Sequence, residues 1–76
     1  MGNRRVVQYV YQRGATYYFV RRVPKDVQRH YKSSRVLICL KKSRRDEAVR
    51  AGMSIAQRLE DYWLSLRLAN IDIPGL

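Results

Sequence analysis

The chain has 76 residues, enough for one small domain whose folding buries only about 60% of the surface of the unfolded chain. Sixteen Lys and Arg residues against six Asp and Glu give a formal net charge of +10, and 46% of the residues are hydrophobic, with six Tyr, one Trp and one Phe. This length disfavours a deep, enclosed active site, and this apolar and aromatic content excludes a disordered basic tail.

The positive charge is concentrated in the first 45 residues. Residues 1–45 contain 13 basic and one acidic side chain, whereas residues 46–76 contain three basic and five acidic ones. Such a one-sided field destabilises a fold unless a polyanion binds, and Arg, which makes 12 of the 16 cations, binds phosphate and guanine bidentately. We therefore expect a nucleic-acid partner and a cytoplasmic protein. We expect no membrane association, since no expected helix combines a basic face with a clean apolar one.

The first expected elements are a flexible basic arm and a β-hairpin. Residues 1–5 are polar and include two adjacent arginines, which predict the arm. Residues 6–12 and 16–22 are rich in β-branched and aromatic side chains, a composition typical of strands. Gly14 lies between them and can supply the positive φ of a tight turn.

A short helix, a third strand and a long helix are expected to follow. A proline ends the second strand and opens a short helix over residues 24–31, and residues 35–41 form the third strand. The long helix begins at a serine N-cap and covers residues 43–69. Residues 70–76 contain a Pro-Gly stop and are expected to form a linker toward a following domain.

These elements predict an α+β fold in a single domain of residues 6–69. A three-stranded antiparallel sheet packs against one long C-terminal helix, with a short helix between the second and third strands. At about 1.5 Å per residue the long helix would measure roughly 40 Å, so its C-terminal half should extend beyond the sheet. We expect this half to support self-association or contact with another domain through Tyr62, Trp63, Leu66 and Leu68.

No residue set of the sequence predicts catalysis, a metal site or a cofactor. His30 is the only histidine and Cys39 the only cysteine, so a Cys/His zinc cluster and an internal disulfide are both excluded. The sequence has no glycine-rich phosphate loop, and the adjacent Glu60 and Asp61 would point in different directions on a helix. We expect that this chain is not an enzyme by itself.

Basic residues interleaved with aromatic residues on short strands are the main functional signal. Such side chains on the outer face of a sheet can enter the major groove of DNA, while turns and helix starts hold phosphates. The candidate DNA-binding residues are Arg4, Arg5, Arg13, Tyr18, Arg21, Arg22, Arg35, Lys41, Lys42, Arg44 and Arg45.

The pattern alone does not decide which face of the sheet binds. A two-residue or four-residue hairpin loop groups the side chains in one way, and a three-residue loop reverses the pairing. For a two-residue loop, one face is Val7, Tyr9, Tyr11, Thr16, Tyr18, Val20 and Arg22, and the other is Gln8, Val10, Gln12, Tyr17, Phe19 and Arg21.

The run Tyr-Val-Tyr-Gln-Arg-Gly-Ala-Thr-Tyr-Tyr-Phe-Val-Arg-Arg-Val-Pro-Lys-Asp-Val at residues 9–27 resembles the N-terminal, arm-type DNA-binding domain of phage-type tyrosine recombinases, or integrases. Residues 36–48 are also similar to that family's third strand and the Glu-Ala start of its helix. Val20 and Lys42 depart from the pattern, which often has Arg and Thr there. The resemblance implies a module that binds double-stranded accessory sites with its sheet in the major groove. The catalytic tyrosine would belong to a later domain, absent here.

Two other functions stay open from the residues alone. Tyrosines on the strands can act as stacking platforms for the bases of RNA or single-stranded DNA. The apolar end of the long helix can instead make the chain an oligomerisation module, which is compatible with DNA binding.

Overall fold

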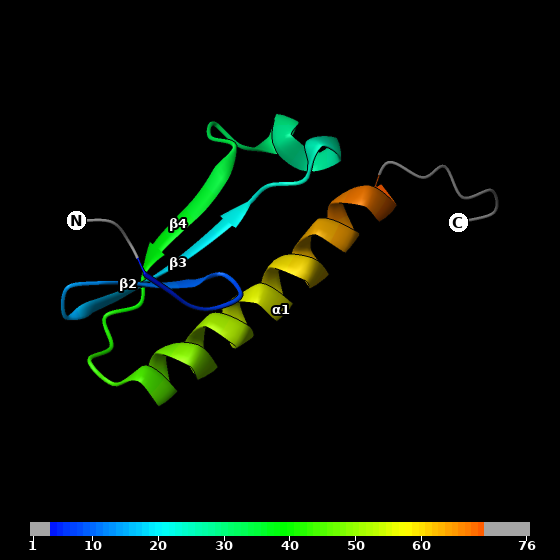
Figure 1. Cartoon of the computed structure of the whole chain (residues 1–76). Helices are drawn as coiled ribbons and strands as arrows, with labels where there is room; N and C mark the ends of the chain where they lie inside the picture. The colour runs from blue at the N-terminus through cyan, green and yellow to red at the C-terminus, as the bar shows by residue number, and fades with distance from the viewer. Residues whose placement is uncertain (1–3, 70–76) are drawn as a thin grey trace.

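The computed structural model describes residues 4–69, which form an α+β domain (Figure 1). Its elements are β1 (Arg4–Val7), β2 (Val10–Arg13), β3 (Thr16–Arg22), the 3-10 helix η1 (Lys25–His30), β4 (Arg35–Cys39) and α1 (Arg45–Ala69). The predicted α+β class, antiparallel sheet and long C-terminal helix are confirmed. The predicted number of three strands is wrong, because the sheet has four strands in the order β1-β2-β3-β4. The predicted linker at residues 70–76 lies outside the described residues.

The fourth strand comes from a turn inside the segment expected to form a single strand. The chain reverses direction between β1 and β2, where Tyr9 adopts a left-handed φ of 72°. The register shifts within β1, which pairs Arg5 with Tyr11 and Val7 with Val10. This irregularity moves side chains from one face of the sheet to the other, because facing alternates with every residue.

The two N-terminal arginines belong to the sheet. Arg4 and Arg5, expected in a flexible arm, instead form the first half of β1. Arg4 pairs with Gln12 and Arg5 with Tyr11. Pairing with β2 therefore fixes the direction of both side chains, and as successive residues they point to opposite faces.

A two-residue turn joins β2 to β3. Gly14 has the positive φ, 61°, that the sequence predicts for this turn. The register pairs Arg13 with Thr16 and Val10 with Phe19. Directly paired residues share a face, so this register selects the first of the two face assignments for β2 and β3.

The helix α1 packs on one face of the sheet. The buried cluster between them consists of Val10, Tyr17, Phe19, Leu40 and Ala48. Burial of one large apolar side chain stabilises a fold by about 1.5–3 kcal/mol, so this cluster holds the two layers together. Gly52 of α1 lies so close to the sheet that a Cβ at this position would overlap the side chain of Val10.

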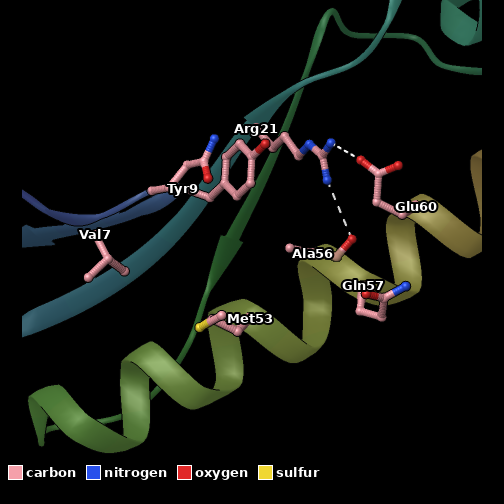
Figure 2. A pocket seen from close by; sticks show the side chains of 8 residues that line it. Val7, Tyr9, Arg21, Met53, Ala56, Gln57 and Glu60 are labelled. Atoms are coloured by element: carbon pink, nitrogen blue, oxygen red, sulfur yellow. Dashed lines mark hydrogen bonds and ion pairs between the residues drawn. The ribbon is translucent and has the colours of Figure 1, made fainter.

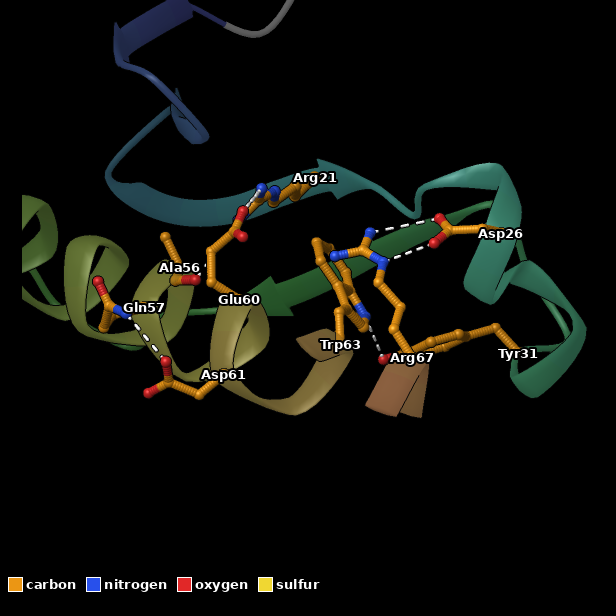
Figure 3. Close-up of polar contacts among 9 residues, drawn as sticks. All are labelled: Arg21, Asp26, Tyr31, Ala56, Gln57, Glu60, Asp61, Trp63 and Arg67. Carbon is orange, nitrogen blue, oxygen red and sulfur yellow. Dashed lines mark hydrogen bonds and ion pairs between the residues drawn. The ribbon is translucent and has the colours of Figure 1, made fainter. Parts of the chain in front are cut away.

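A second cluster covers the C-terminal half of α1. Trp63 is fully buried together with Val23 and Val27, and its indole Nε1 donates a hydrogen bond to Oη of Tyr31 at 2.8 Å. The expectation that this half offers Trp63 to a partner is wrong, because the indole is enclosed by Val23, Val27 of η1 and Tyr31, which follows η1 (Figure 3). Of the other residues expected there, Leu66 is half-buried, and Tyr62 and Leu68 are exposed.

The chain turns from the sheet into α1 through an exposed basic loop. The strand β4 ends at Cys39, although Leu40 N still donates a hydrogen bond to Tyr17 O at 3.0 Å. Lys41 then adopts a left-handed φ of 54°, and α1 begins at Arg45, two residues after the expected serine cap. No helix of residues 4–69 is long and apolar enough to cross a membrane.

Candidate nucleic-acid interface

The two faces of the sheet have different surroundings. One face is covered by α1, and no element of residues 4–69 covers the other (Figure 1). Side chains alternate along a strand and paired residues share a face, so the register determines which residues lie on the uncovered side. This side, called the open face below, consists of Arg5, Tyr11, Arg13, Thr16, Tyr18, Val20, Arg22, Arg35, Leu37 and Cys39.

Four arginines lie at the periphery of the open face. Arg22 and Arg35 are directly opposite each other on β3 and β4, at one end of the strands. Arg13 lies at the other end beside the turn, and Arg5 lies on the edge strand β1. All four are exposed. Like charges directly opposite each other destabilise a strand pair, by up to about 1 kcal/mol, so an anion bound between Arg22 and Arg35 would stabilise the sheet.

The centre of the open face is apolar and aromatic. Val20 and Leu37 are directly paired, and Tyr18 is paired with Tyr11 on one side and Cys39 on the other. These five residues are called the central strip. Leu37 is 69% exposed, the largest exposed fraction among the exposed large hydrophobic residues of the domain, while both tyrosines are half-buried.

Acidic residues are kept away from this surface. The four strands carry six arginines and no acidic residue, and every acidic residue in the described part of the chain lies on η1 or α1. Asp46 lies near Arg44 and Arg50, at 3.3 and 3.7 Å, and Asp61 accepts a hydrogen bond from Gln57. The charged side chains of the strands are therefore all positive, whereas α1 carries four basic and four acidic residues.

Arg21, predicted to bind DNA, has a different place. Its guanidinium lies between the rings of Tyr9 and Trp63, 4.5 and 4.6 Å from their centroids. It forms an ion pair with Glu60 and donates a hydrogen bond to Ala56 O at 3.4 Å (Figures 2 and 3). The side chain is only 13% exposed. Arg21 therefore ties the sheet to α1 and lies apart from the open face that carries the other predicted arginines of β2, β3 and β4.

A cavity of about 340 Å³ adjoins this arginine on the helix side of the sheet (Figure 2). It lies between the β1–β2 turn and α1, and its lining includes Tyr9, Arg21, Met53, Gln57 and Glu60. Arg21, the cation of the lining, is already paired with the carboxylate of Glu60. The cavity therefore offers a ligand mainly apolar contact.

A second ion pair joins η1 to the end of α1 (Figure 3). Arg67 Nε lies 2.5 Å from Asp26 Oδ2, and Arg67 Nη2 lies 3.3 Å from Oδ1. The hydrogen bond from the Arg67 guanidinium lowers the pKa of the Asp26 carboxyl below its ordinary value. This pair links η1 to the end of α1, and the Arg67 guanidinium balances the negative charge of Asp26.

The remaining predicted residues lie beside the open face or behind it. Arg4 is exposed on the helix-covered side of the sheet, since it pairs with Gln12. The four cations of the loop and helix start are all exposed, next to the end of β4: Lys41, Lys42, Arg44 and Arg45.

Five residues of the open face were not among the predicted binding residues: Tyr11, Thr16, Val20, Leu37 and Cys39. Tyr11 lies beside Tyr18, and Leu37 lies between the predicted Arg35 and the end of β4. The missed signal was the alternation within β4, because Arg35, Leu37 and Cys39 share a face. Val7 and Tyr9 were grouped with Tyr11, but the shifted register turns both toward α1, where they line the cavity.

Comparison with known proteins identifies the family. Residues 9–68 match a family described as a domain of unknown function (DUF6538). The chain belongs to this family. No curated protein and no solved structure matches the chain. The matched range of the DUF6538 domain begins at Tyr9 and ends one residue before the end of α1, so it includes β2, β3, η1, β4 and nearly all of the helix.

Metal binding has no support within residues 4–69. These residues contain no group of three or more His, Cys, Asp or Glu side chains placed to hold a metal ion. In this part of the DUF6538 domain, the surface with a distinctive chemistry is the open face.

Proposed function

We propose that this DUF6538 domain binds double-stranded DNA through the open face of its sheet. The observation that carries the proposal is a solvent-exposed sheet surface with four arginines at its periphery and no acidic residue among its members. Phosphate contacts by Arg supply most of the affinity of such surfaces, and a sheet can reach base edges in the major groove.

The central strip favours duplex DNA over single strands. Proteins that bind single strands stack bases on exposed aromatic rings. Here Tyr11 and Tyr18 are half-buried, and the exposed residues of the strip are Leu37 and Cys39, which offer no ring for stacking.

We further propose that the parent protein is a phage-type tyrosine recombinase and that this chain is its accessory-site module. The proposal rests on the resemblance of residues 9–27 and on the open sheet face, and it assigns no catalytic step to this chain. Reading the coding sequence downstream of residue 76 tests it. A domain with recombinase active-site residues supports the assignment, and an unrelated domain contradicts it.

Fluorescence anisotropy with a mixed-sequence duplex at several salt concentrations tests DNA binding. We expect salt-sensitive binding whose log–log slope falls by about one unit for each phosphate contact removed. The Arg22→Ala/Arg35→Ala variant should bind more weakly with a smaller slope. The matched control, Arg50→Ala/Arg58→Ala, removes the same charge from exposed positions of α1 and should bind almost as well as the unchanged chain.

Two results would reject the proposal. Equal loss of affinity in the two double variants would mean that net charge, not the open face, binds DNA. Competition by single-stranded RNA that exceeds competition by the duplex would move the function to RNA or single-strand binding.

A further inference from the structure

The open face has a distinct chemistry at its centre. The paired Val20 and Leu37 place aliphatic groups on β3 and on the edge strand β4, between the Arg22–Arg35 pair and the Tyr18–Cys39 pair. An exposed Leu on a strand contributes nothing to the buried clusters of this domain, in which Leu37 has no part. The sheet therefore combines charge complementarity to a polyanion with an apolar contact at the centre.

The dimensions of the open face match a short run of base pairs. Thr16 and Arg22 lie six residues apart on β3, which corresponds to about 20 Å of strand. At about 3.4 Å per base pair this covers roughly six base pairs when the strand follows the groove. Val20 and Leu37 then lie over the interior of this run, and the arginines lie toward its ends and edge.

The major groove offers one apolar group to such a strip. Each base edge there presents hydrogen-bond donors and acceptors, and only thymine adds a C5-methyl group. Aliphatic side chains placed against polar base edges would remove water from them without replacing their hydrogen bonds, which is unfavourable. Placed against methyl groups, the same side chains gain apolar contact.

We propose that the central strip reads C5-methyl groups of pyrimidines in the major groove, so that the domain prefers duplexes with thymine opposite Val20 and Leu37. This inference rests on the proposed DNA binding and deepens it. The arginines supply affinity through phosphates irrespective of sequence, whereas Leu37 and Val20 supply a preference that depends on methyl groups.

Matched duplexes that differ only in these methyl groups test the inference. One pair is an alternating adenine–thymine hairpin duplex and its adenine–uracil counterpart, both of deoxyribonucleotides. The other is an alternating guanine–cytosine duplex with and without C5-methylation of cytosine. In each pair the methylated duplex should bind more tightly, by a factor of about three to ten, because one fully buried methyl group corresponds to about a fourfold gain.

Three variants separate methyl readout from phosphate contact. Leu37→Ala and Val20→Thr should reduce the methyl preference toward one while leaving the salt slope unchanged. Arg22→Ala/Arg35→Ala should weaken binding to all four duplexes equally and leave the preference intact. Both single variants should fold, because Leu37 is exposed and Val20→Thr keeps a β-branched side chain. Circular dichroism verifies that each variant is folded.

The possible failures have different meanings. Salt-sensitive binding with equal affinity within both pairs, or with tighter binding of the unmethylated members, overturns the methyl readout and leaves the proposed DNA binding standing. A methyl preference that survives both Leu37→Ala and Val20→Thr also overturns it, because another surface then reads the groove. Failure to bind any of the four duplexes overturns both proposals.

Discussion

The covered and open faces of the sheet carry similar residue types with different neighbours. On the covered face, Arg21 lies between two aromatic rings and is paired with Glu60. Its neighbour Arg22 points to the open face, where it is exposed and lies beside Arg35, its pairing partner on the adjacent strand β4. The comparison shows that residue type does not determine the role of an arginine here, because the direction of the strand side chain determines it.

Two adjacent tyrosines of β3 also differ in burial according to the face on which they lie. Tyr17 is buried against α1, whereas the next residue, Tyr18, is half-exposed in the central strip. A substitution on the covered face should therefore change the free energy of unfolding. A substitution on the open face should change ligand binding alone.

Trp63→Ala should have the largest effect on the covered side. Removing this fully buried indole should lower the free energy of unfolding by about 3–5 kcal/mol, against a total of about 4–11 kcal/mol for a domain of this size. It also leaves Tyr31 Oη without its donor. Urea denaturation followed by circular dichroism measures the change. Leu64→Ala, at an exposed neighbouring position, is the control, and equal stability of the two variants would contradict the assignment of Trp63 to the core.

The adjacent arginines give the most direct test of the comparison. Arg21→Ala should lower the free energy of unfolding by about 1–3 kcal/mol, because two cation–π contacts and the pair with Glu60 are lost. Arg22→Ala should change stability by less than about 0.5 kcal/mol and reduce the salt slope of duplex binding by about one unit. Denaturation and anisotropy on both variants measure this. The contrast between the faces fails if both variants lose stability equally.

Gly52→Ala tests the close approach of α1 to the sheet. Alanine raises helix propensity by about 1 kcal/mol, but its Cβ overlaps the short, stiff side chain of Val10, and overpacking typically costs about 1–3 kcal/mol. We expect a net loss of about 1 kcal/mol by thermal denaturation. Ser54→Ala, at an exposed position of the same helix, should be slightly stabilising. A more stable Gly52→Ala would show that the layers can separate without cost.

The smallest effect is expected at the ion pair between η1 and α1. The folded pKa of Asp26 is lowered by Arg67, so the pair stabilises the domain above the unfolded pKa of Asp, about 3.9. This contribution is lost as the pH falls through the folded pKa. Asp26→Asn should therefore melt slightly below the unchanged chain at neutral pH, and the difference should disappear in acid. A difference that does not depend on pH would contradict this origin, and Asp61→Asn serves as the control.

The hairpin could be predicted from the sequence because its signals are local. Gly14 follows a run of β-branched and aromatic residues, and the turn it forms needs only a positive φ. The split of the preceding strand could not be predicted, since Tyr9 in a left-handed conformation depends on tertiary contacts. Its ring lies 5.8 Å from that of Phe19 and under the guanidinium of Arg21.

The sequence predicted which residue types form the candidate site, but it did not predict on which face of the sheet each residue lies. Arg13, Arg22 and Arg35 were predicted as binding residues and lie on the open face, but Arg21 could not be separated from Arg22 without the register. The burial of Trp63 was also hidden, because its partner Tyr31 lies 32 residues earlier in the chain. Contacts at that separation depend on how η1 folds back, which no periodicity encodes.

The alternation of side chains along β3 and β4 has a consequence for which amino-acid substitutions the fold tolerates. Inward residues such as Phe19 are constrained by packing, whereas Leu37 on the next strand is exposed and lies outside both buried clusters. Substitutions at exposed positions typically alter stability by less than about 0.5 kcal/mol. Exposed residues such as Arg22 and Leu37 can therefore change with little effect on stability, while the inward residues between them keep the fold.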